Sequence, residues 1–190
     1  MRFYESPKFK TTEQECTAEL AGILETSPKV ARLLQGIFTL NPRALKRGVT
    51  CRPCHGTEQS SRMGYYDGRY KRVVLCCDNI RSKQQQEETL VHELVHAFDA
   101  SRTGRFTSMC HVVACGEIRA SAIGQCHDIK SPSRKRECIW EDAVRSTAIH
   151  CGGKDFATVF VQQVFENCVK DTAPFIQPRA ATHQQKQQQQ

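Results

Sequence analysis

The ten residues LVHELVHAFD at positions 90–99 place four ionisable side chains inside an otherwise apolar run. Burying such groups without partners is costly, so a buried helix carries them where they have a use. At about 100° per residue, His92, His96 and Asp99 share one narrow stripe of a helix. Glu93 lies beside that stripe, and the apolar residues occupy the opposite arc. The sequence therefore predicts a helix with an apolar back and a polar front whose groups converge on one point.

The segment HELVH has the spacing HExxH. Two imidazoles one helical turn apart can bind the same Zn²⁺, and the glutamate beside the first histidine can reach a water at the metal. We therefore expect His92 and His96 to bind zinc and Glu93 to act as the general base of a peptidase. The alternative is a chance match on a surface helix. A strand signal just before this helix and the apolar rear face of the helix favour the zinc site.

A catalytic zinc needs a third protein ligand, and three residues that follow the motif are candidates. We favour Glu117, and His111 and Asp99 are the alternatives. Asp99, one turn beyond His96, is better placed to orient an imidazole N–H than to bind the metal. A glutamate on a second helix, some twenty residues after the second histidine, is similar to the arrangement in thermolysin-like enzymes.

Small residues surround Glu117 on its predicted helix. Ala114, Ser121 and Gly124 fall within about 60° of it on the helical wheel. We expect this small-residue face to let the second helix approach the HExxH helix closely enough for the carboxylate to reach the metal.

The chain contains eleven cysteines in 190 residues, spread from Cys16 to Cys168. Only Cys51 and Cys54 have CxxC spacing, and a structural zinc site usually needs two such pairs. Scattered cysteines favour a disulfide framework and hence an oxidising compartment. Because the count is odd, at least one thiol has no intramolecular partner. The sequence leaves the pairing open.

The formal net charge is +7, and basic residues gather in two places, at positions 43–52 and 134–136. Such clusters are either solvated surface or contacts for an anionic partner, such as anionic lipid or nucleic acid. No nucleic-acid motif accompanies them. No apolar stretch approaches the ~20 residues of a membrane-spanning helix. The N-terminus resembles neither a secretory signal nor a good mitochondrial presequence.

The pattern along the chain predicts a mainly helical α+β protein with a small sheet. We expect a flexible N-terminus at 1–10, one domain at 11–175, and a disordered Gln-rich tail at 176–190. Residues 51–64 read as a loop and 65–77 as a hairpin. The strand at 72–77 is expected to offer an edge on which an extended substrate docks. Helices are expected at 11–26, 27–38, 82–102, 112–123, 131–149 and 154–169.

From about Glu15 to Phe175 the chain resembles the mitochondrial inner-membrane metalloprotease family that processes an ATP synthase subunit precursor. The resemblance rests on CRPCHG, VVLCCDNI, TLVHELVHAFD, ACGEIRAS, GQC and FENCVKDTAPF. It implies a zincin-like, disulfide-braced metalloprotease domain in which His92, His96 and Glu117 bind Zn²⁺ and Glu93 is catalytic. The segment at 105–107 departs from the family, which usually has an Asp-Trp pair there, and His111 is shifted by one position.

The resemblance also implies a location in the mitochondrial intermembrane space, with peripheral association with the inner membrane and no transmembrane helix. The expected partner is the precursor of an ATP synthase membrane-sector subunit, which the protein would cleave and whose assembly it would assist. A non-proteolytic assembly factor is the alternative from another class. Some relatives carry a Ku-binding label, which would mean a nuclear DNA-repair partner. Eleven cysteines suit the reducing nucleus poorly, so a nucleic-acid partner is not expected.

Overall fold

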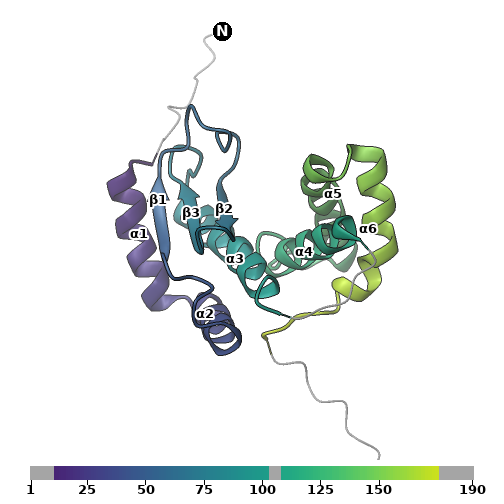
Figure 1. Cartoon of the computed structure of the whole chain (residues 1–190), viewed down its shortest axis with the longest axis horizontal. Helices are drawn as coiled ribbons and strands as arrows, with labels where there is room; N and C mark the ends of the chain where they lie inside the picture. The colour runs from purple at the N-terminus through teal and green to yellow at the C-terminus, as the bar shows by residue number, and fades with distance from the viewer. Residues whose placement is uncertain (1–10, 103–107, 176–190) are drawn as a thin grey trace, which may run out of the picture.

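The computed structural model describes residues 11–102 and 108–175, and Figure 1 shows two groups of elements side by side. One group holds the sheet and the first helices, the other holds the last helices, and α3 and α4 meet between them. The predicted α+β class with a small sheet is confirmed. The segments at 1–10, 103–107 and 176–190, including the predicted flexible N-terminus and Gln-rich tail, lie outside the described residues.

The elements are α1 (Glu13–Thr26), α2 (Pro28–Leu40), β1 (Val49–Arg52), β2 (Gly64–Asp67), β3 (Arg72–Cys76), α3 (Lys83–Asp99), α4 (Met109–Ile123), α5 (Pro132–His150) and α6 (Lys154–Cys168).

Helix starts follow from capping side chains that satisfy otherwise unpaired backbone N–H groups. Thr12 and Glu15 form the capping box that their spacing predicted at the start of α1. Ser27 caps α2, with Pro28 in the first turn, and Ser82 caps α3. Ser108 caps α4, which therefore begins at Met109, three residues earlier than expected.

The sheet has the strand order β1-β3-β2. The hairpin of β2 and β3 is confirmed, with Tyr66 opposite Val73. β1 lies in the segment expected to be a loop and pairs in parallel with β3. The prediction that the strand at 72–77 offers a free edge is wrong, because β3 is paired on both sides. The edge beside the HExxH helix belongs to β2, which contacts α3 directly.

Two hydrophobic clusters form the core, and α4 contributes to both. The first unites α1, α2, the sheet and α3 with Ala120 and Ile123 of α4. The second unites α4 with α5 and α6, and it includes Ala114 and Ile118. α4 therefore ties the two halves of the molecule together.

The face of α4 that approaches α3 carries Gly116, Ala120 and Gly124. A Cβ added to Gly116 would lie 3.5 Å from Nδ1 of His96, and one added to Gly124 would lie 3.3 Å from the carbonyl oxygen of Glu88. The predicted close approach of the two helices is thus confirmed at Gly124. Ala114 belongs to the second hydrophobic cluster and Ser121 bonds to α5, so these two residues face the other side.

Five disulfides brace the fold and leave buried Cys77 as the free thiol, in line with the odd cysteine count. Cys51 and Cys54 belong to different bridges, so the CRPC segment is not a metal pair. Three bridges attach α4 and the residues just after it to α5 and α6. The pairs are Cys16–Cys51, Cys54–Cys76, Cys110–Cys151, Cys115–Cys168 and Cys126–Cys138.

The segment after α6 returns to the first half of the molecule. Arg119, buried on α4, bonds to Asp99 and Asp171 and to the carbonyl oxygen of Ala173. Ala173 and Phe175 pack against the first hydrophobic cluster. Within the described ranges no helix is both long and apolar enough to span a bilayer.

Candidate metal centre

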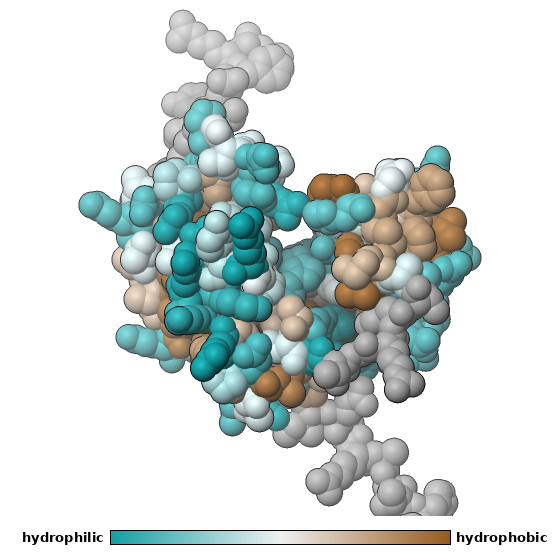
Figure 2. All heavy atoms as spheres, in the orientation of Figure 1, coloured by the Kyte–Doolittle hydropathy of each residue, from teal (hydrophilic) through white to brown (hydrophobic). Residues whose placement is uncertain are grey.

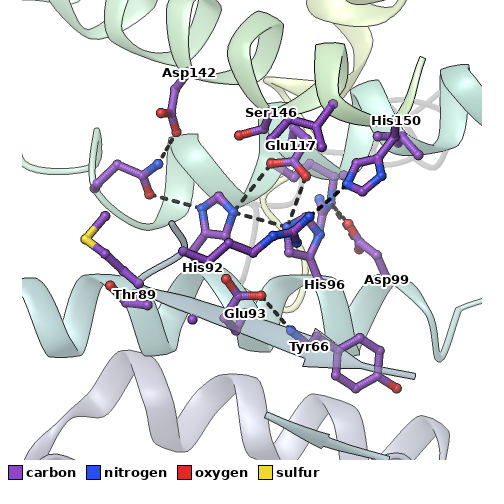
Figure 3. Close-up of a pocket in the computed structure, with 18 of the residues that line it drawn as sticks. Tyr66, Thr89, His92, Glu93, His96, Asp99, Glu117, Asp142, Ser146 and His150 are labelled. Carbon is purple, nitrogen blue, oxygen red and sulfur yellow. Dashed lines mark hydrogen bonds and ion pairs between the residues drawn. The ribbon is translucent and has the colours of Figure 1, made fainter. Parts of the chain in front are cut away.

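Three side chains from α3 and α4 converge at the floor of a cleft, and Figure 3 shows them pointing toward one another. The Nε2 atoms of His92 and His96 are 3.1 Å apart. Each lies 3.5 Å from one carboxylate oxygen of Glu117. One donor atom from each residue lies within 4.8 Å of the others. The structure therefore brings together the two histidines of the motif and the favoured third residue.

The donor set fits a catalytic zinc. Two imidazoles and one carboxylate are a known zinc ligand set, and it leaves a fourth position open. Glu117 is buried, and its Oε2 has no hydrogen-bond partner among the described residues. A buried carboxylate oxygen without a donor is costly, and a cation would satisfy it.

The metal-free site is electrostatically coupled. Burial lowers the pKa of His92, but the 3.5 Å contact of its ring with Glu117 and the negative charges of Glu93 and Glu117 outweigh burial and raise that pKa to about 9. Burial raises the pKa of Glu117, but His96 and His92 outweigh it and lower that pKa to about 2. A proton on His92 thus offsets the carboxylate charge when no metal is bound.

A glutamine and a buried aspartate support His92 from the side opposite the convergent donors. The side-chain oxygen of Gln125 lies 3.1 Å from Nδ1 of His92. The amide nitrogen of Gln125 donates to Asp142 on α5, which also accepts a 2.6 Å bond from Ser121. Sequence reasoning did not identify Gln125 or Asp142, since neither has a periodic relation to the HExxH motif.

Glu93 lies beside the histidines in the same cleft. The residue is 8% exposed, and the backbone N–H of Tyr66 on β2 donates a 2.8 Å hydrogen bond to one of its carboxylate oxygens. Figure 3 shows this carboxylate between His92 and the strand. The edge strand thus holds one oxygen of the expected general base.

The two alternative third ligands are not part of this donor cluster. Asp99 accepts hydrogen bonds of 3.1 and 2.8 Å from Arg119. The prediction that Asp99 orients an imidazole is therefore wrong. Asp99 pairs with Arg119, and the residue that contacts the imidazole of His92 is Gln125. His111 lies in the first turn of α4, 2.7 Å from Gln163 and against the ring of Phe160.

The cleft has a volume of about 1080 Å³ and runs between the two halves of the molecule. Figure 2 shows it as a hollow at the centre of the view. Its walls are β2 and the preceding loop on one side and α4 and α5 on the other. Arg62 and His150 approach each other across it at 3.4 Å. A cleft of this size can admit an extended peptide.

Comparison with known proteins identifies the family. The model of the peptidase M76 family matches residues 14–176. The chain belongs to the peptidase M76 family. This is a zincin-like metalloprotease family, which confirms the predicted fold class and agrees with the donors at the cleft floor.

Relatives in the family carry related names. The chain is 32% identical over 180 residues to the human protein named mitochondrial inner membrane protease ATP23 homolog, covering 88% of this chain and 71% of that protein. The zebrafish protein of the same name is 32% identical over 178 residues, covering 87% and 68%. The Schizosaccharomyces pombe mitochondrial inner membrane protease atp23 is 29% identical over 184 residues, covering 90% and 97%. No solved structure gives a significant match.

Proposed function

We propose that this chain is a zinc-dependent endopeptidase in which Glu93 acts as general base. The observation that carries the proposal is the convergence of His92, His96 and Glu117, with donor atoms within 4.8 Å, beside Glu93 in one cleft. Membership of a metallopeptidase family supports it.

The chemistry is divided among these residues. His92, His96 and Glu117 would hold the ion, which, when bound, lowers the pKa of a water and polarises a substrate carbonyl. Glu93 accepts the proton of the attacking water and passes it to the leaving amine. The N–H of Tyr66 fixes one oxygen of Glu93, so the other oxygen remains available for the proton. The apolar back of α3, buried in the first core cluster, keeps these groups in place.

An extended peptide would bind along β2. β2 is an edge strand of the sheet, and Gly64 and Tyr66 line the cleft. A peptide that adds to a sheet edge binds through its backbone hydrogen bonds. Such binding selects for an extended conformation rather than for particular side chains. This strand, rather than β3, is the substrate platform that we propose.

We extend the proposal to the cellular location of the protein and to its substrate. The names of the relatives and the resemblance of the motifs support a mitochondrial protein at the inner membrane, facing the intermembrane space. The oxidised cysteines fit a compartment that permits disulfides. The proposed substrate is a precursor of an ATP synthase membrane-sector subunit, and the resemblance also supports a role in its assembly.

Variants of the two glutamates test the peptidase proposal. We expect Glu93→Gln to lower turnover by at least about 100-fold, the usual contribution of general base catalysis, while one equivalent of zinc stays bound. Glu117→Ala should lose the zinc and keep its circular dichroism spectrum, whereas His111→Ala should keep both. The measurements are metal content by mass spectrometry and cleavage of the purified precursor.

The exposed Glu141 on α5 supplies the matched control, since Glu141→Gln makes the same change away from the cleft. Near-normal cleavage by Glu93→Gln, or full zinc content in Glu117→Ala, would contradict the proposal. In cells that lack the protein, a Glu93→Gln chain that restores ATP synthase while the precursor stays uncut would assign assembly to the protein independently of cleavage.

A further inference from the structure

Two basic turns that are distant in sequence lie together at one end of the sheet. The segment at 43–48 lies between α2 and β1, and the segment at 68–72 comprises the turn between β2 and β3 and Arg72, the first residue of β3. They are joined by hydrogen bonds of 3.0 Å from Arg47 N–H to the Lys71 carbonyl and from Val73 N–H to the Gly48 carbonyl. Six basic side chains are thereby gathered in one place, namely Arg43, Lys46, Arg47, Arg69, Lys71 and Arg72.

The cluster is strongly cationic. The two turns contain no acidic residue, and the bordering Asp67 pairs with Arg72 at 3.4 Å. The sequence showed only half of this surface, because the residues at 69–72 stand some twenty positions away from those at 43–52. Figure 2 shows the darkest teal side chains projecting toward the viewer on the sheet-bearing half, to the left of the cleft. Such a density of one charge attracts an anionic partner.

A tyrosine stands among the arginines. Tyr70 is 42% exposed, and the guanidinium carbons of Arg47, Arg72 and Arg69 lie 5.0, 5.2 and 5.6 Å from its ring centre. We call Tyr70 together with the six basic residues the Tyr70 patch. Leu40, 49% exposed, ends α2 three residues before Arg43. The patch therefore presents cations together with an exposed aromatic ring and a nearby aliphatic side chain.

This combination favours a bilayer surface over a nucleic acid. Tyrosine rings prefer the headgroup region of a bilayer, where apolar side chains also find contact, and clusters of four to eight Lys or Arg bind anionic lipid there. A phosphate backbone would use the cations but offers nothing for Leu40. None of the six basic residues lines the catalytic cleft, so the patch is separate from the site where a peptide would bind.

The patch adjoins the candidate active site through β2. Gly64 and Tyr66 of this strand line the cleft, and the basic turn begins at Gly68, immediately after the strand ends at Asp67. The patch is therefore separated from the cleft by the length of one short strand.

We propose that the Tyr70 patch is the surface by which this chain binds the headgroups of an anionic phospholipid bilayer. The further consequence, that binding presents the cleft to a substrate emerging from the same bilayer, rests on the proposed peptidase function. The binding itself does not. It requires neither zinc nor Glu93.

Vesicle sedimentation of the full chain tests the proposal. The probes are vesicles of phosphatidylcholine alone and vesicles with added phosphatidylglycerol, at low and high salt. We expect binding only with the anionic lipid and a steep loss with salt. Each basic side chain near such a surface contributes about fivefold in affinity, so Arg43→Glu/Lys46→Glu/Arg69→Glu should bind at least about 100-fold more weakly.

A triple variant with the same change of charge is the matched control. Lys130→Glu/Arg134→Glu/Lys154→Glu alters exposed residues of the other half of the molecule and should bind within about threefold of the wild type. Circular dichroism and zinc content check that both variants fold. Glu93→Gln should bind vesicles like the wild type, so a chain that proves to have no peptidase activity leaves this proposal standing.

Three outcomes would overturn the proposal. The first is equal binding to neutral vesicles, which would mean that charge does not drive it. The second is an equal loss in both triple variants, which would mean that net charge alone matters. The third is absence of vesicle binding by the wild type. The patch would then be either solvated surface alone or, if a DNA oligonucleotide binds through the same residues, a nucleic-acid site.

Discussion

At the scale of single residues, His92 is the side chain whose chemical state the fold controls most closely. The amide nitrogen of Gln125 donates to Asp142, so its oxygen faces the ring and accepts from Nδ1–H of His92. When His92 is neutral, its lone pair therefore lies on Nε2, the atom that faces His96 and Glu117. Because an amide does not titrate, Gln125 accepts from Nδ1–H at every physiological pH, so the proton that zinc displaces is the one on Nε2.

Gln125→Leu should therefore weaken zinc binding by about 10- to 100-fold, the usual effect of losing the partner of a metal-binding histidine. The measurement is competition for zinc with a chelator of known affinity. Gln163→Leu is the matched control, since Gln163 contacts His111 outside the site. Unchanged zinc affinity in Gln125→Leu would show that the hydrogen bond does not position the ring.

The pH dependence of the metal-free protein follows from the same residues. The raised pKa of His92 gives stability that is complete below pH 6.5 and is lost as the pH rises through about 9. The lowered pKa of Glu117 gives stability that is present above pH 4.5 and is lost as the pH falls toward about 2. Zinc requires neutral His92, so binding displaces its proton below pH 9.

Zinc should consequently stabilise the protein more at about pH 8.5 than at about pH 6, since proton release opposes binding at the lower pH. The measurement is the difference in melting temperature between zinc-loaded and metal-free protein across this range. A difference that is constant or larger at pH 6 would contradict the charge coupling between His92 and Glu117.

At the scale of elements, the contact between β2 and α3 sets one wall of the cleft against the helix that carries Glu93. A Cβ added to Gly64 would lie 2.8 Å from a methyl group of Thr89, 3.0 Å from the carbonyl oxygen of Val74 and 3.3 Å from Cγ of Glu93. The strand can lie this close to the helix only with glycine at that position. The same closeness lets the Tyr66 N–H reach Glu93.

Gly64→Ala should lower the free energy of unfolding by about 1–3 kcal/mol, as overpacking does, and should reduce turnover by displacing Glu93. Denaturant unfolding and cleavage assays measure the two effects. Gly22→Ala on α1 is the control, because its Cβ would lie 4.0 Å from the Lys83 ammonium and alanine favours a helix. A Gly64→Ala protein as stable and active as the wild type would disprove the tight contact.

At the scale of the whole molecule, the candidate site spans two halves with separate cores. His92 and His96 belong to the sheet-bearing half, whereas Glu117 projects from a helix shared with α5 and α6. Three disulfides, Cys110–Cys151, Cys115–Cys168 and Cys126–Cys138, secure that helix and its C-terminal turn. The position of Glu117 thus depends on covalent bracing in the second half.

Reduction of the disulfides should therefore release zinc as well as destabilise the fold. Each bridge contributes about 2–4 kcal/mol, so the reduced chain should unfold at much lower denaturant concentration. The sample is treated with a phosphine reductant and an alkylating agent, because the freed thiols would otherwise bind the zinc themselves. Zinc release is followed with a chromogenic chelator, against an untreated sample and one treated with alkylating agent alone. Full zinc retention by the reduced protein would show that the bridges do not hold Glu117 in place.

Sequence alone determined the features that depend on local spacing. HExxH places His92, Glu93 and His96 on one helical face, capping residues set the starts of α1, α2 and α3, and an odd cysteine count requires an unpaired thiol. Of the small residues around Glu117, only Gly124 correctly indicated the close approach of its helix to α3. These inferences succeed because helix periodicity and backbone capping act over a few residues.

Only the tertiary structure decided which distant segments meet. It placed β2 rather than β3 at the edge, set Gln125 in place of Asp99 beside an imidazole, and paired the cysteines. It also joined two basic turns into the Tyr70 patch. No local pattern encodes these contacts, because each depends on the packing of whole elements around two cores that share α4.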